Sequence, residues 1–235
     1  MKYISTVLFS FLTTICLAQN GYEIKVTLKP FKNQYIYLGH YYGKQLPIID
    51  SVKLNDRSEG TFKGSKKLGG GIYLVGYPDR AHNFEILVDK TQKFSVIADT
   101  ARIAALTFVN SPENDDFKAY QKFMTVNGRS IDSLYRLRNG AGKSDSARIN
   151  AQLETLNVRI KKYRSDVIAR EPSSLLAALL KAMKEPEVPK NDPAAQRDSL
   201  YAYHYFKKHY WDGVSFYDDR LARTPFFEPK IDNYF

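Results

Sequence analysis

The chain has 235 residues, a formal net charge of +10, 43% hydrophobic residues and 26% charged residues, which are values typical of a globular protein. The basic residues are spread along the chain without a continuous run, and no nucleic-acid-binding module is recognised, so the sequence argues against nucleic-acid binding. Diffuse positive charge is typical of a solvated surface that faces anionic envelope polymers. Tyrosine and phenylalanine are abundant, with 17 and 14 copies, as expected for strands and helices with one half-buried face.

The start of the chain predicts a secretory signal peptide over residues 1–18. Lys2 precedes an apolar run over residues 4–17, which is too short to span a bilayer as a helix. Small residues before Gln19 predict cleavage after Ala18. A buried N-terminal strand and lipidation of Cys16 are the alternatives, and the bulky residue before the cysteine argues against lipidation. Cleavage removes the only cysteine, so we expect an exported protein of the periplasm or cell envelope with no reactive thiol or disulfide.

The first half of the remaining chain alternates apolar and polar residues with a period of two, which is typical of strands with one buried face. In the first of these segments, Tyr22, Ile24, Val26 and Leu28 alternate with polar residues until Pro30. Six further strands are predicted at residues 35–42, 48–54, 60–63, 72–77, 84–88 and 94–98. This pattern predicts an α+β protein whose residues 19–110 form an antiparallel β-sandwich or barrel of seven or eight strands.

The second half changes to helical periodicity at Ser111-Pro112-Glu113, which resembles a helix start with a hydroxyl cap and a proline in the first turn. This helix is expected to end at residues 139–142, which contain two glycines. The next helix has apolar residues spaced 4, 3, 4, 3 and 4 apart, namely Ile149, Leu153, Leu156, Ile160, Tyr163 and Val167. This seam predicts an antiparallel hairpin with the preceding helix, and a dimeric coiled coil is the less favoured alternative.

Two more helices are expected after Pro172. Ser173 or Ser174 is predicted to cap a short apolar helix, residues 185–193 read as a proline-rich loop, and a fourth helix is expected over residues 194–211. Residues 111–235 are therefore predicted to form an all-α helical domain. Because the apolar pattern stops at Phe235 without a cap, we expect this domain to be truncated at its C-terminus.

Two glycine-containing segments resemble phosphate loops but lack the necessary context. Gly142-Lys143-Ser144 lacks the earlier glycine of the motif, since Leu137 stands at that position. The three glycines at residues 69–71 precede a strand instead of a helix, so a bulge or tight turn is favoured there.

The histidines and acidic pairs do not define a catalytic or metal site. His204 and His209 lie about 140° apart around a helix, which is poor geometry for one metal ion. The adjacent pairs at residues 115–116 and 218–219 could in principle serve acid–base catalysis, but no pattern selects either of them. We therefore predict no catalytic, cofactor-binding or metal-binding residues. A hydrolase that uses such a carboxylate pair remains a minor alternative.

An aromatic cluster near the C-terminus includes the interaction candidates Tyr201, Tyr205 and Trp211. It predicts either a docking surface or, more simply, the core and rim of the helical domain.

Several segments resemble one bacterial family. They are IIDSVKLNDRSEGTFKG, GGGIYLV, FVNSPENDDFKAYQKFM, SSLLAALLKAMKEPEVP and YHYFKKHYWDGVSFYDDRLARTPFFEPKIDNYF. They are similar to the β-rich and helical N-terminal domains that precede a thioredoxin-like or peroxiredoxin-like domain in exported envelope proteins. The resemblance implies a parent protein with thiol–disulfide oxidoreductase activity, while no Cys-x-x-Cys motif exists here to receive a catalytic role.

The resemblance favours a non-catalytic accessory region that docks or spaces a thioredoxin-like redox domain. Its expected partner is that C-terminal domain or another envelope protein, and no cofactor is expected. A stand-alone module that binds an envelope ligand or protein is the alternative, and it predicts an exposed aromatic groove.

Overall fold

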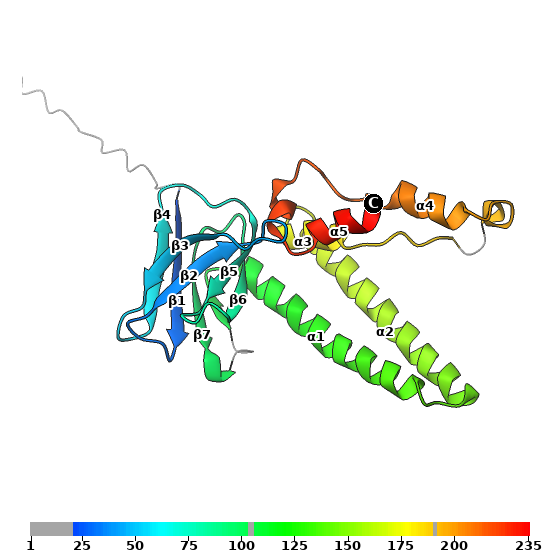
Figure 1. The fold of residues 1–235 in the computed structure, drawn as a ribbon, viewed down its shortest axis with the longest axis horizontal. Helices are drawn as coiled ribbons and strands as arrows, with labels where there is room; N and C mark the ends of the chain where they lie inside the picture. The colour runs from blue at the N-terminus through cyan, green and yellow to red at the C-terminus, as the bar shows by residue number, and fades with distance from the viewer. Residues whose placement is uncertain (1–20, 103–105, 190–191) are drawn as a thin grey trace, which may run out of the picture.

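The computed structural model describes residues 21–102, 106–189 and 192–235. The predicted signal peptide, its cleavage point and Cys16 lie outside the described residues. The described part is an α+β protein in which eight strands in two sheets precede the helices, as predicted (Figure 1). Among these residues, no helix combines the length and the apolar character that crossing a membrane requires.

Two four-stranded sheets pack face to face. The first contains, in spatial order, β4 (Glu59–Gly64), β1 (Tyr22–Lys29), β7 (Lys93–Asp99) and β8 (Thr107–Val109). The second contains β3 (Ile48–Lys53), β2 (Tyr35–His40), β5 (Gly71–Gly76) and β6 (Asn83–Val88). A 3-10 helix, η1 (Thr100–Arg102), follows β7. Alternate apolar side chains of both sheets point inward and form the first core, which includes Ile24, Val26 and Leu28 of β1.

One strand pair departs from the predicted antiparallel arrangement. β1 pairs with β7 in parallel, with Ile24 opposite Phe94 and Val26 opposite Val96, whereas every other pair between named strands is antiparallel. The chain leaves the first sheet after β1, returns to it through β4, and comes back again as β7 after β5 and β6. The alternation of apolar residues specifies which face of a strand is buried but not its direction, so the sequence could not predict this pair.

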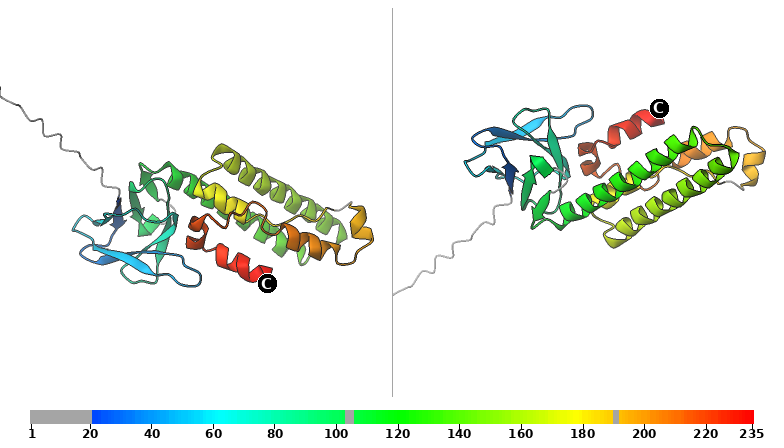
Figure 2. Two further views of the ribbon diagram at one scale, coloured as in Figure 1. Left: turned by 90° about the horizontal axis from the view of Figure 1, so that it is seen from above. Right: turned by 90° about the horizontal axis from the view of Figure 1, so that it is seen from below.

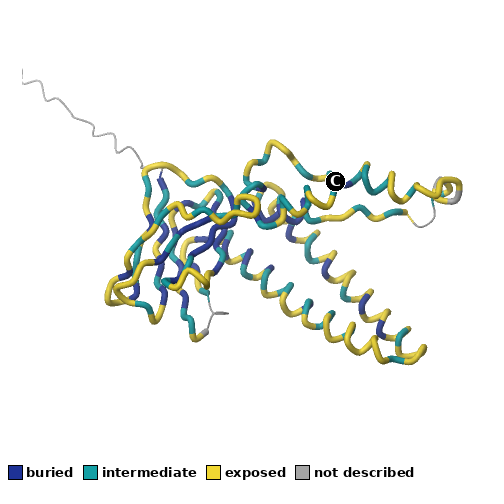
Figure 3. The backbone as a smooth tube through the Cα atoms, viewed as in Figure 1, coloured by how far each residue is buried: buried dark blue, intermediate teal, exposed yellow. Residues whose placement is uncertain are grey.

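Two long helices form the predicted hairpin, α1 (Pro112–Arg138) and α2 (Lys143–Arg170). Four residues of the α2 seam are buried, and Tyr163 of this seam stacks on Phe123 of α1 with ring centroids 3.9 Å apart. The seam therefore packs within the chain, which confirms the antiparallel hairpin. The hairpin extends away from the sandwich, and its tip is exposed (Figures 1 and 3).

The start of α1 differs from the prediction in its hydrogen bonding. Ser111 precedes the helix, but its hydroxyl does not cap a backbone N–H; it accepts a hydrogen bond of 2.8 Å from the side-chain amide of Asn114. The same amide group bridges to β6, because Asn114 Oδ1 accepts from the N–H of Leu87 and Asn114 Nδ2 donates to its carbonyl, both at 2.7 Å. Asn114 is fully buried. The segment thus joins the first helical turn to the edge of the second sheet.

The remaining helices are short: α3 (Leu175–Ala182), η2 (Pro193–Gln196), α4 (Tyr201–His209), η3 (Asp219–Arg223) and α5 (Phe227–Tyr234). Ser174 caps α3 as predicted, since its hydroxyl accepts from the N–H of Ala177. The single helix predicted over residues 194–211 is wrong, because η2 and α4 are separate elements. Asp198 interrupts it: its carboxylate accepts from the N–H of Leu200 at 2.8 Å, a local turn that competes with continued helix.

A second core joins the two halves of the chain. Ile72 of β5 and Leu87 of β6 face away from the sandwich interior and pack with apolar side chains of α1, α2 and α3 and with Leu221 of η3. The first five residues of β5 are therefore buried on both faces of the sheet. Figure 3 shows buried residues concentrated in the sandwich and at this junction. We call residues 192–235 the C-terminal arm; the arm and the hairpin both extend from the same side of the sandwich (Figure 2).

Candidate functional site

The three glycines at residues 69–71 lie beneath two arginines of the C-terminal arm. A Cβ atom at Gly70 would come within 2.7 Å of the Arg220 side chain, and one at Gly71 within 2.4 Å of Arg223 Cβ and 2.9 Å of its carbonyl oxygen. Arg223 Nε also donates a hydrogen bond of 2.8 Å to the carbonyl of Gly70. The glycines therefore allow the arm to lie close to the backbone that precedes β5. The sequence predicted a local bulge or tight turn at these glycines but not this contact with a distant part of the chain.

Arg220 connects this approach to two carboxylates. Its guanidinium makes a bidentate pair with Asp218 and donates to Asp89, which follows β6, and all three nitrogen–oxygen distances are 2.7 Å. All three side chains are largely shielded from water. Hydrogen bonding from Arg220 holds the pKa of Asp218 below its ordinary value, so this carboxylate stays ionised. We call Arg220, Arg223, Asp89, Asp218 and the glycines at 69–71 the arginine clamp.

The clamp accounts for the acidic pair at residues 218–219. Asp218 pairs with Arg220, and Asp219 forms an ion pair with Arg223 one helical turn later. Because Asp218 is ionised and held by a guanidinium, it is a poor proton donor and is unsuited to general acid catalysis. The other pair, at residues 115–116, lies in the first turns of α1, where Asp116 forms an ion pair of 3.3 Å with Arg170 of α2.

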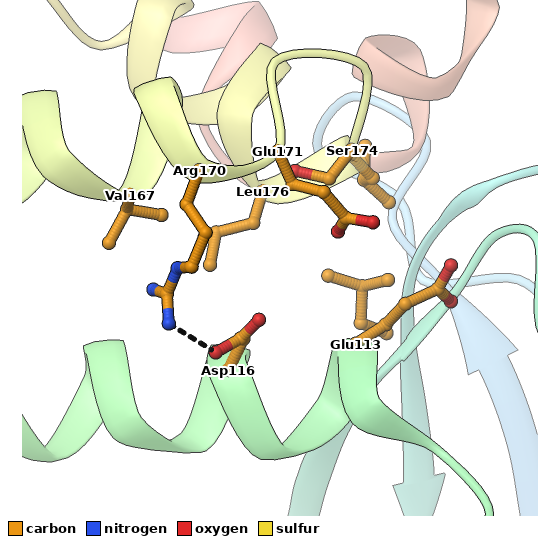
Figure 4. A pocket seen from close by; sticks show the side chains of 9 residues that line it. Glu113, Asp116, Val167, Arg170, Glu171, Ser174 and Leu176 are labelled. Carbon is orange, nitrogen blue, oxygen red and sulfur yellow. Dashed lines mark ion pairs between the residues drawn. The ribbon is translucent and has the colours of Figure 1, made fainter.

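A small cavity lies between the start of α1 and the α2–α3 connection (Figure 4). Glu113, Asp116, Glu171 and Arg170 line its polar side, and leucine and valine side chains line the rest. Burial raises the pKa of Glu113, while the backbone N–H of Thr91 donates to its carboxylate at 3.4 Å. The space admits about one water molecule, so this acidic cluster supports the junction and does not accommodate an organic substrate.

The histidines do not gather into one site. His82 and His209 each lie 2.7 Å from a nearby aspartate on the surface, while His40 Nδ1 lies 2.8 Å from the carbonyl of Tyr41. Within the described ranges, no group of three or more histidine, cysteine or acidic side chains has an arrangement that could hold a metal ion.

The three predicted interaction candidates fall into two separate groups on the arm. Tyr201 and Tyr205 lie one turn apart on α4, with ring centroids 5.9 Å apart, and the hydroxyl of Tyr201 donates to Asp192. Trp211 lies after α4, where its ring contacts Tyr210, Phe216 and Tyr234. No ring contact in the described part of the chain links these groups, so the structure does not bring the three candidates together.

The Trp211 group also holds a lysine. Lys230 of α5 places its ammonium 4.0 Å from the ring centre of Tyr210 and 5.5 Å from that of Trp211. Burial lowers the pKa of Lys230, although the ring faces attract the cation. These contacts join the segment after α4 to α5, while Phe216, Tyr217 and Phe235 are largely exposed.

A groove opens between the hairpin and the arm. It is lined by Tyr120, Gln121, Met124 and Thr125 of α1, Arg164 of α2, Met183 after α3 and Phe226 before α5. Its volume is about 510 Å³, and it is wide open to solvent. The groove is apolar apart from Gln121, Thr125 and the Arg164 guanidinium.

The sequence patterns did not single out the clamp arginines, Asp89 or Arg164 as functional. The triple glycine and the Arg220/Arg223 spacing were the available signals, but their contact joins positions about 150 residues apart in the chain. The described residues therefore offer two features of functional interest, a charged clamp and an apolar groove. Comparison of the chain with protein-family models and with curated proteins found no match.

Proposed function

We propose that this chain is the non-catalytic docking and positioning region of an exported envelope protein that works with a thioredoxin-like redox domain. The observation that carries this proposal is the arginine clamp. It fixes the C-terminal arm against the sandwich through charge-assisted hydrogen bonds at Arg220, so that the arm keeps one orientation. A positioning region needs this rigidity, because it must hold its partner at a constant distance and angle.

The state of the polar side chains supports a non-catalytic role. Asp116, Asp218 and Asp219 are engaged by arginines, and Asn114 is engaged by the β6 backbone. Each of these groups has a structural contact that explains its position. Catalytic groups, in contrast, are commonly left with strained or perturbed environments in a cleft that can admit substrate.

The arm supplies a surface for docking. Phe216, Tyr217 and Phe235 are 64%, 100% and 96% exposed; the ring of Phe216 contacts Trp211, that of Phe235 contacts Tyr234, and Tyr217 follows Phe216 in the chain. Aromatic side chains are enriched at protein–protein interfaces, so exposed aromatics close together on the arm favour a contact site there. We place the contact with the redox domain on this surface.

The proposal is tested first by the reading frame downstream of the Phe235 codon, which should encode a thioredoxin fold. The purified chain should then bind the isolated redox domain in calorimetry, and Tyr217→Ser should weaken that binding by about tenfold or more, as for a hot-spot aromatic. Tyr135→Ser, at an exposed position of α1, is the matched control and should have no effect. Disulfide turnover by the chain alone, or a reading frame without a redox domain, would contradict the proposal.

The alternative function is a stand-alone module that binds an envelope protein or ligand. One observation favours it: the groove beside Arg164 provides a recognition site that needs no redox domain.

A further inference from the structure

Arg164 is the arginine of α2 whose charge has no partner. The other three arginines of this helix each have an acceptor: Arg148 pairs with Asp145, Arg159 donates to Asn127 and Arg170 pairs with Asp116. For Arg164, no hydrogen bond or ion pair occurs within the part of the chain that the structure describes, and its Nε is shielded from solvent without an acceptor.

A shielded donor without an acceptor is destabilising, and such groups are rare in native proteins. The guanidinium keeps its charge at all physiological pH values and offers donors in a rigid plane that matches a carboxylate. The shielded Nε is out of reach of a ligand, but the terminal nitrogens of Arg164 are not among the shielded atoms, so they remain open to the groove and can pair with one carboxylate.

The apolar wall of the groove is adaptable. Met124 and Met183 face it from α1 and from the end of α3, and Phe226, which is 39% exposed, lies before α5. Unbranched thioether side chains adjust to differently shaped apolar partners, which makes methionine frequent at peptide-binding surfaces. The ligand that complements these contacts has apolar side chains and an adjacent negative charge.

The shape of the groove favours a peptide over an enclosed small molecule. It is wide open to solvent, so that a ligand bound there can be part of a larger chain. An enclosed pocket would instead surround most of a small ligand.

We propose that this groove binds a peptide segment of a partner protein that carries an aspartate or glutamate next to one or two large apolar side chains. The carboxylate pairs with Arg164, and the apolar side chains lie against Met124, Met183 and Phe226. This inference specifies the partner of the binding-module alternative. It rests on contacts of the groove alone, so its test requires no redox domain and can fail independently of the docking proposal.

The methionines provide a specific readout. The sequence contains three methionines, and apart from Met1 both of them line the groove. Labelling the protein with [¹³C-methyl]methionine therefore gives two groove signals in a methyl spectrum. A random-peptide display library is selected on the immobilised protein, and the enriched peptides are synthesised and titrated against the labelled sample. We expect the enriched sequences to place an acid beside leucine, isoleucine or phenylalanine, and to shift both methyl signals.

The charge pairing is tested by exchanging both partners. Amidation of the peptide acid to glutamine or asparagine should weaken binding to the wild type about tenfold, as expected for a charge-assisted hydrogen bond. Arg164→Gln should weaken binding of the acidic peptide by a similar factor and remove the difference between the two peptides. Phe226→Ala should weaken both peptides, because it removes part of the apolar wall. Arg148→Gln, at an exposed pair on the same helix, is the matched control and should change neither.

Circular dichroism of each variant establishes that its fold is intact, and the exposed positions of Phe226 and Arg148 make those two variants safe in this respect. The inference would be overturned by a library that yields no enriched peptides, by enriched peptides without an acid, or by unchanged methyl signals. Equal affinity of the acidic peptide for the wild type and Arg164→Gln would overturn it as well, since water alone would then satisfy the guanidinium.

Discussion

Replacing Arg220 by methionine should release the C-terminal arm from the sandwich. Methionine preserves the apolar stem of the side chain over Gly70 but removes the guanidinium, and thereby leaves Asp89 and Asp218 without their ion pair. Breaking a buried ion pair costs about 3–5 kcal/mol, whereas an exposed pair is worth about 0–1 kcal/mol. The side chains of Arg220, Asp89 and Asp218 are 21%, 12% and 17% exposed, which places this pair near the buried limit. We therefore expect a loss of about 3 kcal/mol in the free energy of unfolding.

Urea unfolding measures this loss with two probes. Far-UV circular dichroism reports on the whole chain, and fluorescence reports on the arm, because Trp211 is the only tryptophan. For a urea dependence of about 2 kcal/mol per molar, the midpoint should fall by about 1.5 M. The two probes should give the same midpoint in the wild type, while in Arg220→Met the fluorescence transition should precede the other.

Two controls separate the ion pair from other effects of the substitution. Arg148→Met removes an ion pair whose side chains are 71% and 62% exposed, and should change stability by less than about 0.5 kcal/mol. A double-mutant cycle with Asp89→Asn isolates the coupling between Arg220 and Asp89, which should exceed about 1 kcal/mol. A stability of Arg220→Met within about 0.5 kcal/mol of the wild type would refute the assignment of the clamp. A coupling near zero would show instead that packing of the Arg220 stem, not its charge, holds the arm.

Three further predictions concern the contacts around the clamp and the junction. Gly71→Ala should lower the free energy of unfolding, measured in urea, by about 1–3 kcal/mol, because its Cβ would collide with Arg223. Gly128→Ala is the control: it lies within α1, no atom lies within 4 Å of the new Cβ, and it should raise the free energy of unfolding by about 0.5–1 kcal/mol. Equal effects of the two substitutions would contradict the close approach at Gly71. Asn114→Ala should lower the free energy of unfolding by about 2–4 kcal/mol, because it leaves the buried backbone N–H and carbonyl of Leu87 in β6 without partners. Faster hydrogen exchange of the Leu87 N–H is the independent measurement. The pKa of Asp218 is lowered, so its stabilising effect is present above its ordinary value of 3.8 and is lost as the pH falls below it. The urea midpoint of Asp218→Asn should consequently fall less than that of the wild type between about pH 5 and pH 2, and parallel curves would argue against this titration.

The alternating pattern of the first half predicted the strands because burial on one face of a sheet imposes a period of two. β5 is a continuous apolar run that was predicted from the glycines before it and from Pro78-Asp79 after it, and its burial on both faces depends on helices that lie later in the chain. Likewise, the heptad spacing of α2 predicted a packed seam, and the structure confirms it because four residues of the seam are buried. Strand direction in the β1–β7 pair and the break at Asp198 were missed. The first is a property of the path of the chain between sheets, and the second depends on one side chain that bonds its own backbone.

The candidate sites were much less predictable than the fold. A charged residue has the same appearance in a sequence whether its partner is water, an aspartate or nothing at all. Arg164 and Arg170 lie six positions apart on one helix, and the structure alone distinguishes the unpaired guanidinium from the paired one. The aromatic residues predicted either a docking surface or the core and rim of the helical domain. Tyr201 and Tyr205 were grouped with Trp211 because they are close in sequence, whereas the rings form separate groups.

The strand β6 explains why the two halves of the chain can act as one rigid unit. It is an edge strand, and an exposed edge offers unpaired backbone groups to other chains. Asn114 satisfies the backbone of Leu87 in this strand, and Asp89, directly after it, receives Arg220 from the arm. The helices thus protect the edge of the sheet with the same contacts that fix their own position. Because both contacts lie beside the β6 edge and the second core, loss of either should weaken the packing of the helices on the sandwich, and this couples the orientation of the arm to the stability of the sandwich, as the proposed positioning function would require.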